Sequence, residues 1–246
     1  NYAREVMQLF TIGLYELNLN GTEKTDAAGK RIDSYTQSDV TNLARVFTGY
    51  DFDRSDGVRI TVPNQTYTIE SREFARKPML LTASKHSTLE STFLGTTIPA
   101  NAPAAEALQT ALDTLFNHPN VGPFFARQMI QRLVTSNPSP GYVARVAARF
   151  NDNGSGERGD LRAVWAAILL DDEARGPQSL ANPGHGKLRE PMLRLVQWAR
   201  SFGVTSAAGS WKIFELGNAS SQLGQSPLRA PSVFNYFRPG YVPPAS

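Results

Sequence analysis

Five segments in the second half of the sequence repeat apolar residues every three or four positions, which is the spacing of an amphipathic helix. They are residues 104–118, 121–135, 141–151, 160–172 and 187–202. The breaks between them are rich in Asn, Pro, Gly and Ser, which favour turns. Helices joined so closely must bury their apolar faces against one another. These residues therefore predict a multi-helix bundle.

The first fifty residues predict two further helices. Apolar residues recur at helical spacing from Val6 to Leu14. A second helix begins after Thr36, with Asp39 at the spacing of a capping box, and it stops at Gly49. Residues 16–35 between the two helices are polar and contain two turn signals, so we expect a long excursion with a small hairpin.

Alternation of apolar and polar residues replaces the helical period between residues 50 and 99. It is clearest in residues 59–62, 66–70 and 79–82, and Pro63 ends the first of these strands. We therefore expect a mostly α fold, a multi-helix bundle with a small antiparallel β insert. Residues 1–246 are expected to form a single helical domain fragment, with the β-rich insert at about 50–99 and a Pro/aromatic tail at 210–246.

Charge and composition exclude several classes of protein. The 25 Lys and Arg against 22 Asp and Glu give 25 − 22 = +3, with no dense basic run, so we expect no nucleic-acid partner. No stretch approaches the roughly 20 consecutive apolar residues of a membrane span. The absence of cysteine excludes thiol catalysis, disulfides and thiolate metal sites.

The polar stripe of the first helix is the sharpest candidate site. Arg4 and Glu5, beside Gln8, are able to bind a charged group through a guanidinium fork and a carboxylate. The alternative is a structural ion pair with the second helix, which carries Asp39 and Arg45. We favour the ion pair, because paired Arg and Glu at helix interfaces usually set the register.

His86 is the next candidate, since a loop histidine beside Lys85 can act as a general base or as one metal ligand. The other two histidines, His118 and His185, lie in predicted turns, and no HExxH or HxH spacing exists. A histidine zinc site is therefore not expected.

Two acidic segments have simpler interpretations than metal binding. Residues 151–160 resemble a calcium loop, but the twelfth position is Arg162, where a bidentate Glu is required. A turn whose Asp160 caps the next helix explains the same residues. The acids at 171–173 lie at the end of a predicted helix, where anions are unfavourable, and we interpret them as a solvated face. We expect no metal and no cofactor.

The tail concentrates four aromatic residues within positions 234–241. Such a cluster suits a carbohydrate or peptide platform, because flat rings bury area at little entropic cost. It equally suits a terminal strap packed across the bundle, and we favour the strap.

Three blocks of sequence resemble the bacterial Domain of Unknown Function 1800 family in order and spacing. They are residues 1–13 (NYAREVMQLFTIG), residues 35–50 (YTQSDVTNLARVFTGY), and His86-Ser87 followed by FLG at 93–95. The similarity continues in residues 125–128, 159–164, 187–191 and 230–235. Gln8 and Ser87 stand where the family frequently has Glu and Asp, which weakens a metal or acid–base role at those positions.

The resemblance implies an exported protein, periplasmic, on the outer surface or secreted. It also implies that the chain is the central to C-terminal part of a longer protein. The missing N-terminal helical part of the same protein is then an expected partner, and some apolar faces should be bare.

The family has no assigned biochemical role, so two hypotheses of function stand. The first is a non-catalytic role in binding or scaffolding an envelope protein or polymer. The second is a hydrolase acting on an extracellular polymer through Glu5, Asp39 or His86. Convergence of Arg4, Glu5, Asp39 and His86 in one pocket would favour the enzyme.

Overall fold

The computed structural model describes residues 1–69, 71, 73–209 and 215–241. Its backbone divides into two compact units, Asn1–Phe125 and Ala126–Ser246. This division does not test whether the two units form a single domain, which stays a prediction. Of the predicted segments, position 70 of the second predicted strand and positions 210–214 and 242–246 of the tail lie outside the described residues.

The first predicted helix has two parts. α1 (Tyr2–Glu5) is an α-helix, and it continues as the wider π-helix η1 (Val6–Thr11). The Thr11 hydroxyl donates to the carbonyl of Val6, five residues earlier, at 2.7 Å, which supports the wider turn. Gly13 then ends the segment with a φ of +74°, and a Cβ at this position would lie only 2.8 Å from the Phe124 ring. Both the backbone and the packing therefore require glycine.

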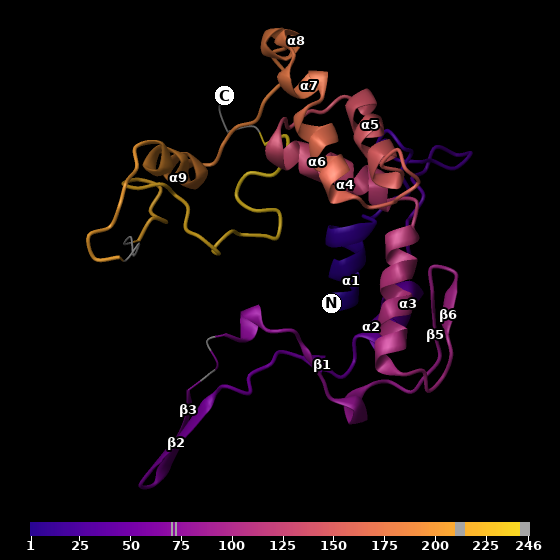
Figure 1. Cartoon of the computed structure of the whole chain (residues 1–246), viewed down its shortest axis with the longest axis vertical. Helices are drawn as coiled ribbons and strands as arrows, with labels where there is room; N and C mark the ends of the chain where they lie inside the picture. The colour runs from indigo at the N-terminus through magenta and orange to yellow at the C-terminus, as the bar shows by residue number, and fades with distance from the viewer. Residues whose placement is uncertain (70, 72, 210–214, 242–246) are drawn as a thin grey trace. The chain divides into compact units, whose positions relative to one another are not determined.

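The second predicted helix is confirmed as α2 (Gln37–Val46), together with its capping box. The Thr36 hydroxyl accepts from the Asp39 amide at 3.3 Å, and the Asp39 carboxylate accepts from the Thr36 amide at 2.7 Å. Val40, Leu43 and Val46 are buried. In the first unit α2 packs against α1, α3 (Ala104–Asn117) and β5 (Figure 1).

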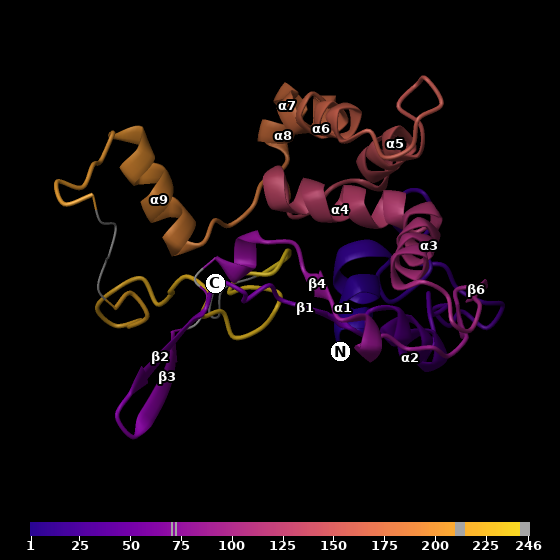
Figure 2. The ribbon, with the colours of Figure 1, turned by 60° about the horizontal axis from the view of Figure 1, so that its bottom comes forward.

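The small antiparallel β insert is confirmed, in the form of three separate two-stranded pairs. These are β1 (Tyr50–Asp51) with β4 (Leu80–Leu81), β2 (Val58–Val62) with β3 (Gln65–Ile69), and β5 (Ser91–Phe93) with β6 (Thr96–Ile98). Short 3₁₀ turns occupy Phe74–Arg76 (η2) and Ala83–Lys85 (η3). The β2–β3 pair forms a ribbon of its own (Figure 2). The excursion before α2 is held by isolated antiparallel bridges, among them Tyr15 with Asp33.

The mostly α bundle is also confirmed. α4 (Val121–Leu133) begins in the first unit and ends in the second, which continues with α5 (Pro140–Asn151), α6 (Leu161–Leu169), α7 (Asp172–Arg175), α8 (Pro177–Ala181) and α9 (Pro191–Ser201). α5 packs against α6, with Tyr142, Val146, Val164 and Ile168 fully buried. Within the described residues, no helix combines the length and hydrophobicity needed to cross a membrane.

The acidic segments of the second unit act as helix caps. Asp160 accepts from the Ala163 amide at 3.2 Å and caps α6, as predicted. The interpretation of residues 171–173 as the end of a helix was wrong, because α6 stops at Leu169. Asp171 begins α7 by accepting from the Glu173 amide at 2.9 Å. The acids therefore lie at a helix N-terminus, where anions are favourable.

One buried amide joins the two ends of the first unit. Asn120, 1% exposed, accepts from the Leu17 amide at 2.9 Å and donates to the carbonyls of Ile12 at 2.9 Å and Tyr15 at 2.8 Å. Its partners are more than 100 positions away in the chain. All three partners are backbone groups, so the side chain takes the place of a strand for residues 12–17.

We expect Asn120→Ala to lower the free energy of unfolding of the first unit by about 2–4 kcal/mol, because it leaves several backbone groups without partners. Urea unfolding followed by circular dichroism measures the change. Asn117→Ala is the matched control: its amide donates only to Asp113 one turn earlier on the exposed surface of α3, so the loss should stay below about 0.5 kcal/mol. Equal losses in the two variants would contradict this role of Asn120.

Candidate functional site

The polar stripe of α1 faces the start of α2. Arg4 donates to the side-chain carbonyl of Gln37 and lies in hydrogen-bonding range of the Tyr35 hydroxyl. Tyr35 donates to Gln8 at 3.1 Å. Burial raises the pKa of Tyr35, Arg4 opposes this shift, and the charge of Glu5 adds to it. The structure thus brings Arg4, Glu5 and Gln8 together with Tyr35.

Sequence reasoning missed Tyr35, although its place directly before the N-cap of α2 was a usable signal. The ion pair favoured from sequence is not formed. No salt bridge joins Arg4 or Glu5 to Asp39 or Arg45, all of which the structure describes. Hydrogen bonds to an amide and a phenol take its place.

Asp39 is fully engaged by the backbone and by its cap. One carboxylate oxygen accepts from the Thr36 amide at 2.7 Å and hydroxyl at 2.6 Å, and the other from the Leu94 amide at 2.8 Å. Burial acts to raise the pKa of Asp39, but the hydrogen bonds from Thr36 and Leu94 outweigh it and the pKa is lowered. The carboxylate therefore joins α2 to the turn between β5 and β6 and stays ionised.

Arg45 and His86 line one small hollow beneath α2. Arg45 donates to the Glu90 carbonyl at 2.6 Å. His86 Nδ1 lies 3.0 Å from the Thr48 carbonyl, and since a carbonyl only accepts, this nitrogen carries the proton. The hollow has a volume of about 10 Å³, which holds one water molecule at most. His86 and Arg45 therefore have no room for a ligand between them.

A larger hollow, which sequence reasoning missed, lies in the second unit. Its volume is about 670 Å³, and polar side chains line it. They include Asn137, Asp172, Glu173, Gln178, Asn182 and His185. These residues come from three segments that each resemble ordinary turns in the sequence, so no local pattern marked them.

Paired charges hold the wall of this polar hollow. Glu173 accepts from the Ser139 amide at 2.8 Å and hydroxyl at 2.5 Å. Arg145 donates twice to Asp171, at 2.8 Å each time, and these bonds lower the pKa of Asp171. Among the residues that the structure describes, no group of three or more His, Asp or Glu side chains is arranged to hold a metal ion.

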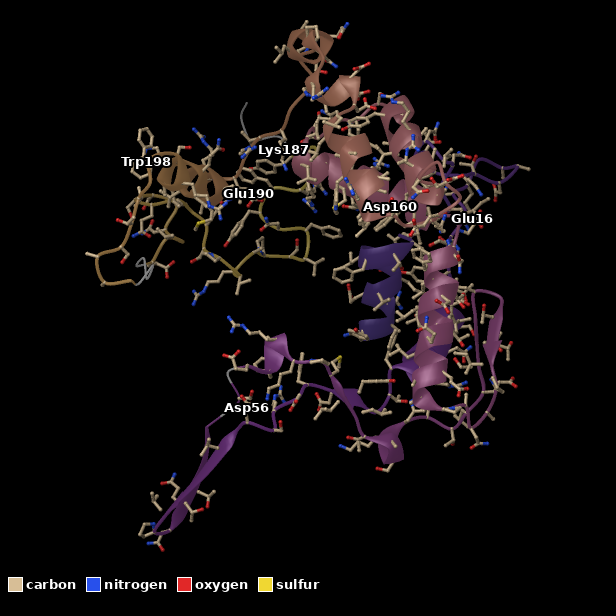
Figure 3. All side chains as sticks on the ribbon, in the orientation of Figure 1. Glu16, Asp56, Asp160, Lys187, Glu190 and Trp198 are labelled. Carbon is tan, nitrogen blue, oxygen red and sulfur yellow. The ribbon has the colours of Figure 1, made fainter. Side chains whose placement is uncertain are left out.

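Lys187 and Glu190 connect three parts of the second unit. The Lys187 ammonium donates to the carbonyls of Gln131 at 3.2 Å and Arg132 at 2.8 Å, at the C-terminal end of α4, where a cation is favourable. Burial lowers the pKa of Lys187, and the neighbouring charges of Arg132 and Arg189 lower it further. Figure 3 labels Lys187 and Glu190 on the segment that leads into α9.

Glu190 holds the tail. Its carboxylate, in a residue only 7% exposed, accepts from the Asn235 amide at 2.9 and 3.0 Å and from the Phe237 backbone amide at 3.0 Å. The rings of Phe237 and Tyr241 stack with their centroids 4.3 Å apart. These contacts favour the strap over an open aromatic platform. Two sequence blocks 40 residues apart, 187–191 and 230–235, therefore meet at one carboxylate.

We expect Asp39→Asn to lower the free energy of unfolding at neutral pH by about 1–2 kcal/mol, because the amide cannot replace the carboxylate in the capping box. The pKa of Asp39 is lowered in the folded protein, so its contribution is present above the ordinary value of 3.8. It is lost as the pH falls through the lower folded value. Urea unfolding of the wild type and of Asp39→Asn, at neutral pH and below pH 3.8, measures this loss. The difference between their free energies of unfolding should become smaller at the lower pH.

The matched control for Asp39 is Asp113→Asn, on the exposed face of α3, where the change should stay below about 0.5 kcal/mol. A difference between wild type and Asp39→Asn that stays constant with pH would contradict the assigned role.

We expect Glu190→Gln to release the tail, because one of its acceptor oxygens becomes a donor that opposes the Asn235 amide. Hydrogen exchange at the Phe237 amide should become at least about tenfold faster. Glu157→Gln, in the exposed turn before α6, is the control and should leave this amide unchanged. Unaltered protection of Phe237 in Glu190→Gln would show that other contacts hold the strap.

Comparison with known proteins places the chain in a family. A family model described as "Protein of unknown function (DUF1800)" matches residues 1–246. The match covers the whole chain, so it does not bear out the narrower expectation that the chain is only the central to C-terminal part. No curated protein and no solved structure matches. The chain therefore belongs to the DUF1800 family of proteins of unknown function.

Proposed function

We propose that this chain is a non-catalytic binding module of an exported protein, and that it holds an envelope protein or an extracellular polymer. The observation that supports this role is that the fold itself occupies predicted catalytic groups. Both oxygens of Asp39 accept hydrogen bonds, and the hollow that His86 lines, of about 10 Å³, is too small for a ligand. General acid–base catalysis needs such groups aimed at a reacting atom.

The polar hollow of the second unit is the proposed contact with a polymer. Amide side chains such as Gln178 and Asn182 both donate and accept hydrogen bonds, and carboxylates such as Asp172 accept them. Sugar hydroxyls have the same dual character. A polyhydroxylated chain therefore suits this lining better than an apolar or an anionic ligand.

Export, and association with a missing N-terminal helical part, remain part of this proposal. Large apolar side chains are exposed in the first unit, with Phe10 at 73% and Tyr2 at 59%. Such a surface is the type that another part of the same protein would cover.

The alternative function is a hydrolase acting on an extracellular polymer, and one observation favours it. Among the described residues, no hydrogen-bond donor is assigned to the Glu5 carboxylate, and the charges of Glu5 and Asp33 both help to raise the pKa of Tyr35. An enzyme at this place would use Glu5 as its acid or base.

Incubation of the protein with a panel of insoluble polysaccharides, followed by measurement of both bound protein and released sugar, separates the two functions. We expect binding without release, and about tenfold weaker binding in Gln178→Ala with Asn182→Ala, because each lost hydrogen bond removes about 0.5–1.5 kcal/mol. Gln109→Ala, an exposed amide on α3, is the matched control.

Glu5→Gln and His86→Ala should leave binding unchanged. Release of sugar that Glu5→Gln abolishes would overturn the proposal in favour of the hydrolase. Failure of every polymer to bind would overturn the polymer as the partner.

A further inference from the structure

The small net charge of the chain conceals a separation of charge along it. Residues 187–246 contain seven Lys and Arg and two Asp and Glu, which gives 7 − 2 = +5. Residues 1–186 contain the remaining 18 basic and 20 acidic residues, which gives 18 − 20 = −2. The basic character of the protein thus lies entirely in its last part, which contains α9.

α9 is an amphipathic helix, and among the described residues none buries its apolar side. At about 100° per residue, Trp198, Phe202 and Leu195 fall on one side of the helix. Arg194 lies at the border of that side, next to Trp198, and Arg200 lies on the opposite side. Phe202 is 72% exposed and Trp198 55%, and no residue of α9 is buried. The two aromatic rings contact each other, with centroids 5.6 Å apart.

The exposed charged side chains of residues 187–202 are all basic. Arg189, Arg194 and Arg200 are exposed. The one acid of this segment, Glu190, is buried and bound to Asn235 and Phe237, so its charge is directed to the tail. The outer surface of the helix therefore combines exposed rings with cations.

The exposed apolar residues at the end of α6 lack this combination. Leu169 and Leu170 are 49% and 58% exposed, but Asp171, Asp172 and Glu173 follow them directly. An anionic surface would repel that end of α6. Charge therefore distinguishes α9 from the exposed end of α6.

We propose that α9 binds an anionic lipid surface, with Trp198 and Phe202 in the headgroup region and Arg194 beside them at a lipid phosphate. Helices with a basic polar face and Trp, Phe or Leu on the other face lie in membrane interfaces in this manner. Tryptophan is favoured there because its ring is apolar and its N–H is polar. A nucleic acid would attract the arginines but would leave the exposed aromatic and aliphatic groups in water.

Lipid binding goes beyond the proposed function, because it uses a different surface from the polar hollow. A negative result in the polymer assay therefore leaves the lipid proposal standing, and a negative result in a vesicle assay leaves the proposed function standing. Loss of polymer binding in Gln178→Ala with Asn182→Ala should leave vesicle binding intact.

Co-sedimentation of the 246-residue protein with vesicles tests the proposal. We expect binding to vesicles of phosphatidylcholine and phosphatidylglycerol in equal parts, much weaker binding to phosphatidylcholine alone, and a decrease with added salt. Arg194→Gln should weaken binding about fivefold, since one arginine near an anionic surface contributes about 1 kcal/mol, and Arg200→Gln, on the opposite side of α9, should weaken it less. Trp198→Ala with Phe202→Ala should weaken it at least about tenfold.

The matched controls are Arg175→Gln, an exposed arginine on α7, and Leu169→Ala with Leu170→Ala, and both should bind as the wild type does. Circular dichroism confirms that each variant is folded. Equal binding to neutral vesicles, or α9 variants that are folded and bind normally, would overturn the proposal. Binding to heparin or DNA without binding to vesicles would replace the lipid surface with a polyanion.

Discussion

The buried side chain of Asn120 is the interaction on which the first unit depends. It satisfies backbone groups of Ile12, Tyr15 and Leu17, a segment that has no neighbouring strand to do so. Gly13 lies within the same segment, and its missing Cβ admits the ring of Phe124, four residues after Asn120. The two contacts place the end of η1 against the start of α4. They give a structural reason for the glycine that closes the block at residues 1–13.

The segment at residues 187–191 has the corresponding role in the second unit. Lys187 and Glu190 carry opposite charges three positions apart and act in different directions. The cation joins the free carbonyls at the end of α4, and the anion holds Asn235 and Phe237 of the tail. Because both charges are used internally, the arginines and aromatic rings of α9 remain as its outer surface. The contacts of Lys187 and Glu190 thus leave the arginines and apolar side chains of α9 exposed.

The polar residues that first suggested chemistry are mostly parts of this architecture. Asp39 closes a capping box and reaches Leu94, Arg45 binds the Glu90 carbonyl, and His86 binds the Thr48 carbonyl. Because both oxygens of Asp39 accept hydrogen bonds, its carboxylate is held ionised as part of the helix cap. The surfaces proposed for function are the polar hollow and α9.

The sequence by itself determined where helices begin and which residues they bury, because capping and apolar periodicity act over a few positions. Thr36 with Asp39 and Asp160 before α6 are examples, and so are the turns that separate the bundle helices. It did not determine the π-helical turn of η1 or the early end of α6, where side-chain bonds and caps compete with the helical period. The tertiary structure alone decided the partner of each polar side chain. Asn120, Glu190 and the lining of the polar hollow depend on distances between segments that lie tens of residues apart, and no local pattern records such distances.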